Sequence, residues 1–175
     1  MSMTLRYRRL VLTAHVATSV GWLGAVAAFL ALAIAGLTNW QVQMMRAAYL
    51  AMELTATWVI VPLCLASLLT GIVSSLGTRW GLIRQYWVLL KFLITLLSTL
   101  LLLMHMPPIH FMAGMAADTM VSSAEPHALR IQLVIQAAAA LISLVVATTL
   151  AVYKPKGITP YGWRKLHEQR AVART

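Results

Sequence analysis

Residues 86–106 read YWVLLKFLITLLSTLLLLMHM, an apolar run whose only charged side chain is Lys91. A helix that crosses a bilayer needs about 20 consecutive, mostly apolar residues. Three further runs meet this requirement, at residues 10–37, 49–76 and 129–153. The sequence therefore predicts an all-α fold, an integral membrane four-helix bundle formed by a single domain over residues 1–175, with a tail at 154–175.

The composition excludes several other classes of protein. The chain is 61% hydrophobic and only 10% charged, whereas a soluble domain carries roughly 25% charged residues. Disordered chains have low hydrophobicity, and Cys64, the one cysteine, has no partner in the chain for a disulfide scaffold.

The formal charge of +10 maps onto the two sides of the predicted bundle. On one side lie Arg6, Arg8, Arg9, Arg79, Arg84, Lys154, Lys156, Arg164, Lys165, Arg170 and Arg174. Only Arg46 and Arg130 fall on the other side. Cytoplasmic segments of membrane proteins carry the Lys and Arg excess, so we expect a bacterial plasma membrane protein with both termini cytoplasmic (N-in/C-in). The basic side would meet the anionic headgroups of the lipid bilayer, and no nucleic acid partner is expected.

Polar side chains within the runs recur at helical spacing. The third run carries Lys91, Thr95, Ser98, Leu102 and His105 at intervals of four and three residues. The first run places His15, Ser19 and Trp22 on one face in the same way. Such spacing defines one face of a helix, and polar groups inside a membrane usually face the bundle or a cavity.

His15 and Lys91 both lie near the predicted cytoplasmic ends of their helices. Lys91 either extends its ammonium to the interface or faces a cavity, where it would hold an anionic group such as a porphyrin propionate or a quinol-derived anion. His15 is a candidate iron ligand or proton carrier, since its unperturbed pKa is near 6.5. The alternative is a neutral histidine bonded across the bundle, for example to Thr148 or Thr149.

A second candidate site lies toward the opposite surface. Its potential metal ligands are Met104, His105, Met106 and His110. Thioether sulfur suits Cu(I) and imidazole suits copper, zinc or iron, so copper binding is one interpretation. Ordinary packing beside the longest connection, residues 107–128, is the other. Glu53 is expected to form an ion pair with Arg130 or His105 at this end.

Several short motifs resemble known membrane proteins. Residues 13–16 (TAHV), 21–24 (GWLG) and 87–91 (WVLLK) resemble a bacterial family of small four-span membrane proteins, known as a domain of unknown function. The likeness covers nearly the whole chain, including residues 152–155 and 159–163. It implies the four-span fold and no particular activity.

More distantly, His15 with Trp22-Leu23-Gly24, and Trp87 with Lys91, are similar to HemJ-type protoporphyrinogen oxidases and to the membrane part of CopD-like copper proteins. The first resemblance implies haem b near His15 and Lys91, and porphyrinogen oxidation. A histidine frequent in that family between the tryptophan and the lysine is replaced here by Leu89 or Leu90. This departure weakens the oxidase assignment more than it weakens porphyrin binding. The second resemblance implies copper.

Three functional hypotheses follow. The leading one is a haem-b-binding redox or porphyrin-handling protein in which His15 is the iron ligand, Lys91 holds an acidic group and Trp22 contributes to the cofactor site. The second is copper handling by the outer methionines and histidines. The third is a non-catalytic accessory subunit of a membrane complex. A membrane redox partner or self-association is a further expectation, and the sequence leaves enzymatic activity open.

Overall fold

The chain folds into helices throughout the part that the computed structural model describes, which is residues 4–39, 41–76, 85–117, 127–155 and 157–164. The elements in chain order are α1 (Leu5–Thr38), α2 (Val42–Thr55), the π-helical η1 (Ala56–Ile60), α3 (Val61–Leu76), α4 (Tyr86–Ala117) and α5 (His127–Tyr153). No strand occurs in these ranges, and Gln85 and Ile158 form an isolated bridge. The predicted all-α class is confirmed.

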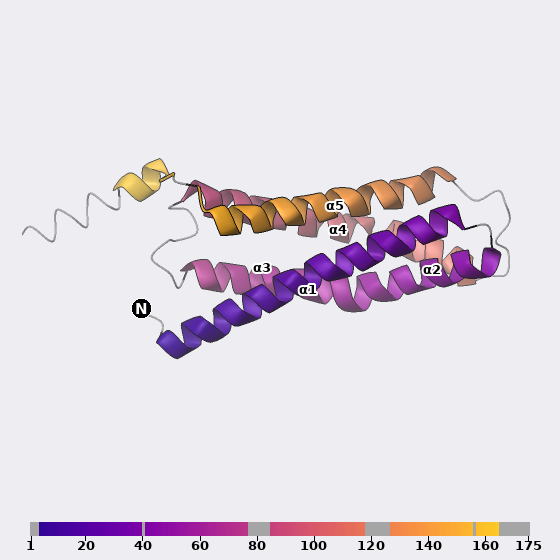
Figure 1. Cartoon of the computed structure of the whole chain (residues 1–175), viewed down its shortest axis with the longest axis horizontal. Coiled ribbons are helices and arrows are strands. Elements are labelled where there is room, and N and C mark those ends of the chain that lie inside the picture. The colour runs from indigo at the N-terminus through magenta and orange to yellow at the C-terminus, as the bar shows by residue number, and fades with distance from the viewer. Residues whose placement is uncertain (1–3, 40, 77–84, 118–126, 156, 165–175) are drawn as a thin grey trace, which may run out of the picture.

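The helices form four long rods that lie side by side (Figure 1). The segments α2, η1 and α3 follow one another without a break and make the second rod. Helix α1 packs against α2, α3 and α5, and α4 packs against the same three helices. The amino-terminal end of α1 and the residues that follow α5 lie at the same end of the bundle (Figure 1).

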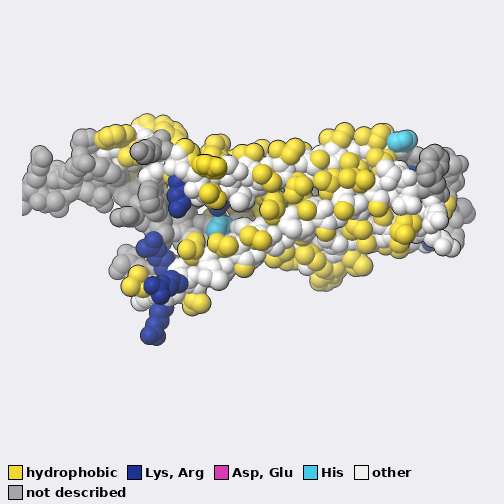
Figure 2. Space-filling model, in the orientation of Figure 1, with side chains coloured by type: hydrophobic (Ala, Val, Ile, Leu, Met, Phe, Trp, Pro, Cys, Tyr) yellow, Lys and Arg dark blue, Asp and Glu magenta, His cyan; other side chains and the backbone are white. Residues whose placement is uncertain are grey.

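All four rods are long and apolar enough to cross a membrane, as the sequence predicts. Their outward faces carry large apolar side chains along much of their length; Leu97, Ile135 and Ile142, for example, are all more than half exposed. Figure 2 shows hydrophobic side chains over most of the visible face and a group of Lys and Arg side chains near one end. This distribution is typical of a surface that meets lipid rather than water.

The interior of the bundle is held by close packing. Met52, Ile60, Cys64 and Met112 are fully buried, and they belong to one cluster that also contains Trp22. Lipid tails are as apolar as these side chains, so helix association in a membrane depends on packing and interhelical hydrogen bonds. In this buried, apolar setting Cys64 packs as a small hydrophobic residue.

The second rod contains a local widening. The π-helical turn η1 directly precedes Val61 and Pro62. Proline has no N–H to donate, and its ring crowds the preceding turn. A widened turn is a common way for a membrane helix to accommodate this loss, and π segments are frequent inside long helices.

Helix α4 is longer than expected. The sequence predicts that the third span ends at Met106 and that a connection follows from Pro107, but α4 continues through Pro107 and Pro108 to Ala117. The helix persists because Ile109, Met112, Ala113 and Ala116 form a buried face, while α4 packs against α2. Helix α2 likewise begins at Val42, before the expected start near Tyr49.

Part of the predicted basic side lies outside the described residues. This applies to Arg79, Arg84, Lys156, Lys165, Arg170 and Arg174. Arg6, Arg8, Arg9, Lys154 and Arg164 are described. Helix α5 ends next to Lys154, whose φ of 44° is the left-handed conformation that commonly terminates helices.

Candidate functional site

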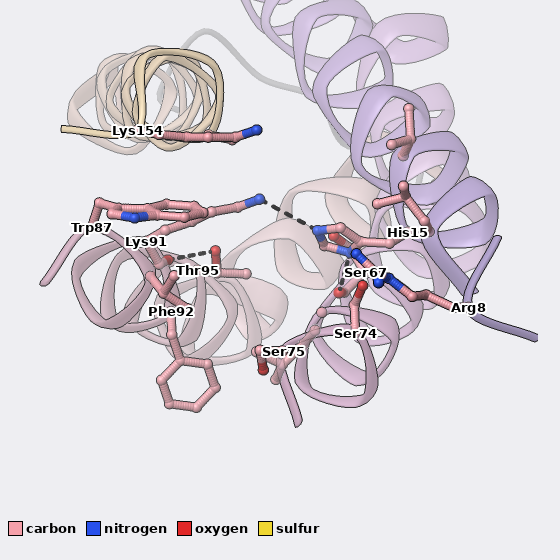
Figure 3. Close-up of a pocket in the computed structure, with 16 residues that line it drawn as sticks. Arg8, His15, Ser67, Ser74, Ser75, Trp87, Lys91, Phe92, Thr95 and Lys154 are labelled. Atoms are coloured by element: carbon pink, nitrogen blue, oxygen red, sulfur yellow. Dashed lines mark hydrogen bonds between the residues drawn. The ribbon is translucent and has the colours of Figure 1, made fainter. Parts of the chain in front are cut away.

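A cleft of about 410 Å³ opens at the end of the bundle where α1 begins and α5 ends. Helices α1, α3 and α4 line it together with the last turn of α5 and the residue that follows. Pockets for small ligands commonly measure about 300–1,000 Å³. The lining side chains that carry functional groups include Arg8, His15, Trp87, Lys91 and Lys154 (Figure 3).

His15 is anchored to α3 through one nitrogen of its ring. Its Nδ1 lies 3.1 Å from the carbonyl oxygen of Ser67 and 3.2 Å from Oγ1 of Thr70. A carbonyl oxygen only accepts, and the Thr70 hydroxyl donates to the Ala66 carbonyl at 2.6 Å. Nδ1 therefore carries the proton, and Nε2 presents its lone pair. His15 is thus bonded across the bundle, as one of the two alternatives predicts, but its partners are on α3. Thr148 and Thr149, the partners suggested by the sequence, bond to the backbone of α5 itself.

The other ring nitrogen of His15 meets Lys91. Nζ of Lys91 lies 3.3 Å from Nε2, so the ammonium donates to the imidazole lone pair. The two residues come from α1 and α4 and point toward one another across the cleft (Figure 3). Of the two alternatives for Lys91, the geometry matches a cation that faces a cavity.

Gly71 makes room for the imidazole. A Cβ atom at this position of α3 would lie 3.1 Å from Cε1 of His15, closer than carbon atoms ordinarily approach. The ring is thus held between its anchor on Ser67 and the bare backbone of Gly71. This arrangement restricts the direction in which Nε2 can point.

The cleft is strongly basic. Arg8 from α1, Lys91 from α4 and Lys154 after α5 all line it, and no Asp or Glu of the described segments is among its lining residues. Arg8 and His15 are seven residues apart on α1, which places them on one face two turns apart. An anionic group that enters the cleft would find several hydrogen-bond donors there.

The remaining walls are mainly apolar. Leu12, Val16, Leu68, Val88 and Phe92 line the cleft beside the indole of Trp87. Trp87 is one helical turn from Lys91, so both project from the same face of α4. The lining thus combines a flat aromatic surface, a nitrogen lone pair and three cations.

The structure does not place every predicted residue in this cleft. Trp22, expected at the cofactor site, is 3% exposed in the apolar core and does not line the cleft. Ser19, on the same face of α1 as His15, bonds instead to the Ser67 hydroxyl at 2.7 Å. This bond fixes α1 against α3 next to the residue that anchors His15.

The side chains of the second candidate site, Met104, His105, Met106 and His110, do not converge on one point. Met104 is 73% exposed, whereas Met106 packs against the core; two residues apart, they differ by about 200° around the helix. His105 Nδ1 bonds to the Leu101 carbonyl within its own helix. Among the described residues, no group of three or more His, Cys, Asp or Glu is placed to hold a metal ion.

The polar contacts at this end connect α2 with α4. Glu53 accepts a hydrogen bond of 2.6 Å from His110. The partner predicted from the sequence, Arg130 or His105, is therefore wrong. The Arg130 guanidinium lies 5.9 Å from the ring centroid of Tyr49. Arg46 donates to the carbonyl oxygens of Ala116 and Ala117 at 2.6 and 2.9 Å and thereby caps the end of α4.

The residues that orient His15, which are Ser67, Thr70 and Gly71, are not among the site residues predicted from the sequence. Ser67 and Gly71 are four residues apart and therefore share one face of the second span, and this spacing is the only signal for them in the sequence. In the sequence, Arg8 and Lys154 indicate only which side of the bundle is basic. Their place in the cleft depends on how the ends of α1 and α5 lie in space, which the sequence does not show.

The fold and this cleft define the class of protein: an all-helical bundle of four membrane-length helices with a basic cleft at one end. No protein-family model, curated protein or solved structure gives a significant match to the chain.

Proposed function

We propose that this chain is an integral membrane protein of a bacterial plasma membrane, with both termini cytoplasmic. The support is the asymmetry of its charge. Arg6, Arg8, Arg9, Lys154 and Arg164 precede or follow the spans on one side. That excess is expected at the cytoplasmic face, and in that orientation it lies against anionic headgroups. The cleft then opens on the cytoplasmic half of the bilayer.

Within that setting, we propose that the cleft binds haem b, an iron tetrapyrrole with two carboxylates. The observation that carries the proposal is the orientation of His15. Its Nδ1 is bonded to the Ser67 carbonyl and its Nε2 faces the cleft. Histidines that bind metals commonly donate their second nitrogen to a carbonyl or carboxylate, which fixes the ring and the tautomer.

The other lining residues fit the remaining parts of such a ligand. Arg8, Lys91 and Lys154 would hold the propionate carboxylates, since Arg and Lys form strong charge-assisted bonds to carboxylates. Trp87 and Phe92 would contact the flat macrocycle, whose apolar faces favour aromatic and aliphatic walls. The resemblance of His15, Trp87 and Lys91 to residues of HemJ-type proteins supports the same ligand.

Haem b supplies one-electron chemistry when bound, and the chain contributes its binding and orientation. His15 would ligate the iron, and the Ser67 carbonyl would hold the proton of Nδ1 in place. We propose a redox or porphyrin-handling role, with a membrane redox partner or self-association. Leu89 and Leu90 stand where HemJ-type oxidases often carry a histidine, so no oxidase activity is proposed.

Copper handling stays a prediction. Met104 and Met106 point away from each other on α4, and His110 is engaged with Glu53. The haem proposal is favoured because its residues lie around one cleft. An accessory role in a membrane complex is the alternative if no cofactor binds.

The proposal is tested by titrating the purified chain in mild detergent with hemin, the ferric form of haem. We expect a shifted and sharpened Soret band that saturates at one equivalent in the wild type. His15→Ala should lose the shift, whereas His105→Ala, a matched change at the other end of the bundle, should keep it. Equal titrations for wild type and His15→Ala would overturn the proposal, as would a wild type that binds no hemin.

A further inference from the structure

Lys91 contacts Nε2 of His15, the ring nitrogen that a metal ion would have to bind. Its Nζ donates to Nε2 at 3.3 Å, so the lone pair that would bind iron is already engaged. This inference rests on the proposed function and concerns how the cleft admits its ligand.

The imidazole has little freedom to move away from Lys91. Nδ1 is bonded to Ser67 and Thr70 at 3.1 and 3.2 Å. On its other side the ring lies against Gly71, where even a methyl group would come within 3.1 Å of Cε1. Nε2 is therefore released by movement of Lys91 rather than of His15, because the lysine ends a flexible four-carbon chain.

An anion is the natural agent for that movement. A carboxylate accepts a stronger hydrogen bond from an ammonium than a neutral imidazole does. Among the described residues that line the cleft, none offers a carboxylate to Lys91, and Arg8 and Lys154 attract one from outside. A ligand that carries an acid group would draw Lys91 away from His15 as it enters.

We propose that Lys91 is a carboxylate-operated gate on His15. A tetrapyrrole with free acid groups opens the gate and reaches Nε2, whereas a metal complex without acid groups meets a capped histidine. Lys91 thereby couples recognition of the acid group to ligation of the metal, and it selects anionic tetrapyrroles over neutral ones.

The test compares hemin with hemin dimethyl ester, in which both carboxylates are blocked, by Soret titration of the full chain in detergent. In the wild type, we expect hemin to bind about tenfold or more tightly than the ester, the usual scale for a hydrogen bond to a charged group. In Lys91→Met, the ester should bind about tenfold more tightly than it does to wild type, because the cap is gone. Lys154→Met removes a cleft cation that does not bond to His15 and should weaken hemin without improving the ester.

Tighter binding of the ester by Lys91→Met distinguishes a gate from a lysine that only attracts the carboxylates of hemin. A Lys91→Met variant that weakens hemin and leaves the ester unchanged would make Lys91 an ordinary cation and overturn the gate, while His15-dependent hemin binding would leave the proposed function standing. Absence of hemin binding in the wild type would overturn both. Lys91→Gln, which is also uncharged, provides a second variant if the methionine variant does not purify as a single species.

Discussion

Nζ of Lys91 and Nε2 of His15 lie 3.3 Å apart at the basic end of the bundle, across the cleft between α4 and α1. The contact joins residues that are 76 positions apart in the chain. The contact brings two polar residues of apolar helices together in one site. It also places the ammonium of Lys91 against Nε2, the atom that would bind a metal in the proposed function.

Gly71→Ala should weaken the site without weakening the fold. The added methyl would lie 3.1 Å from Cε1 of His15 and would displace the ring from Ser67. Loss of such supporting contacts commonly reduces metal affinity by about ten- to a hundredfold, and we expect hemin affinity to fall by about tenfold. The measurement is a Soret titration beside chemical denaturation in detergent.

Gly24→Ala is the matched control, because a Cβ at Gly24 meets nothing within 4 Å. It should raise the free energy of unfolding by about 0.5–1 kcal/mol, as alanine replaces glycine in a helix, and leave hemin affinity unchanged. Equal hemin affinity in both variants would contradict the role given to Gly71.

Lys154→Gly should make the protein more stable and its hemin binding weaker. Lys154 has a φ of 44°, a conformation that costs a residue with a side chain about 1–2 kcal/mol and costs glycine little. The variant should unfold at a free energy about 1 kcal/mol higher. Loss of its exposed charge should weaken hemin binding by about two- to fivefold, the scale of an exposed ion pair.

Arg6→Gln controls for the charge, because Arg6 does not line the cleft. Its hemin affinity should equal that of the wild type. If Arg6→Gln and Lys154→Gly weaken hemin binding equally, the effect comes from the general field of the basic end, and the specific contact is wrong.

Arg46→Ala should destabilise the opposite end of the bundle. Arg46 donates to two carbonyl oxygens at the end of α4, at 2.6 and 2.9 Å. Hydrogen bonds that involve a charged group contribute about 1.5–3 kcal/mol, so the free energy of unfolding should fall by about that amount. Gln43→Ala, an exposed position on the same helix, should change it by less than about 0.5 kcal/mol. Hemin affinity should stay at the wild-type value, and a large loss would show that the two ends are coupled.

The proposed orientation predicts which end is accessible from outside the cell. With Cys64 replaced by alanine, Gln43→Cys should react with a membrane-impermeant maleimide in intact cells. Thr4→Cys, at the start of α1, should react only after the membrane is permeabilised. The reverse pattern would mean that both termini are outside.

The sequence predicts the helical architecture well because long apolar helices leave strong, local signals. Each span is a long apolar run, and the spacing of Lys91, Thr95 and His105 marks one face of α4. Depth along a helix follows from residue number, so the sequence alone predicts that His15 and Lys91 lie at the same end of the bundle.

The remaining features depend on packing between helices, which residue number does not determine. The sequence predicts a connection from Pro107 onward, but contacts of Met112 and Ala116 in the core keep α4 helical beyond Pro107 and Pro108. Trp22 shares the face of His15, yet it packs in the core because its depth differs.

The most direct test of the central claim is the reduced-minus-oxidised spectrum of the full chain purified in mild detergent from cells with ample haem supply. We predict Soret and α bands of a b-type haem in the wild type, their loss in His15→Ala and their retention in His105→Ala. A wild-type spectrum without these bands, or one that His15→Ala leaves unchanged, would contradict the assignment of His15 as a haem ligand.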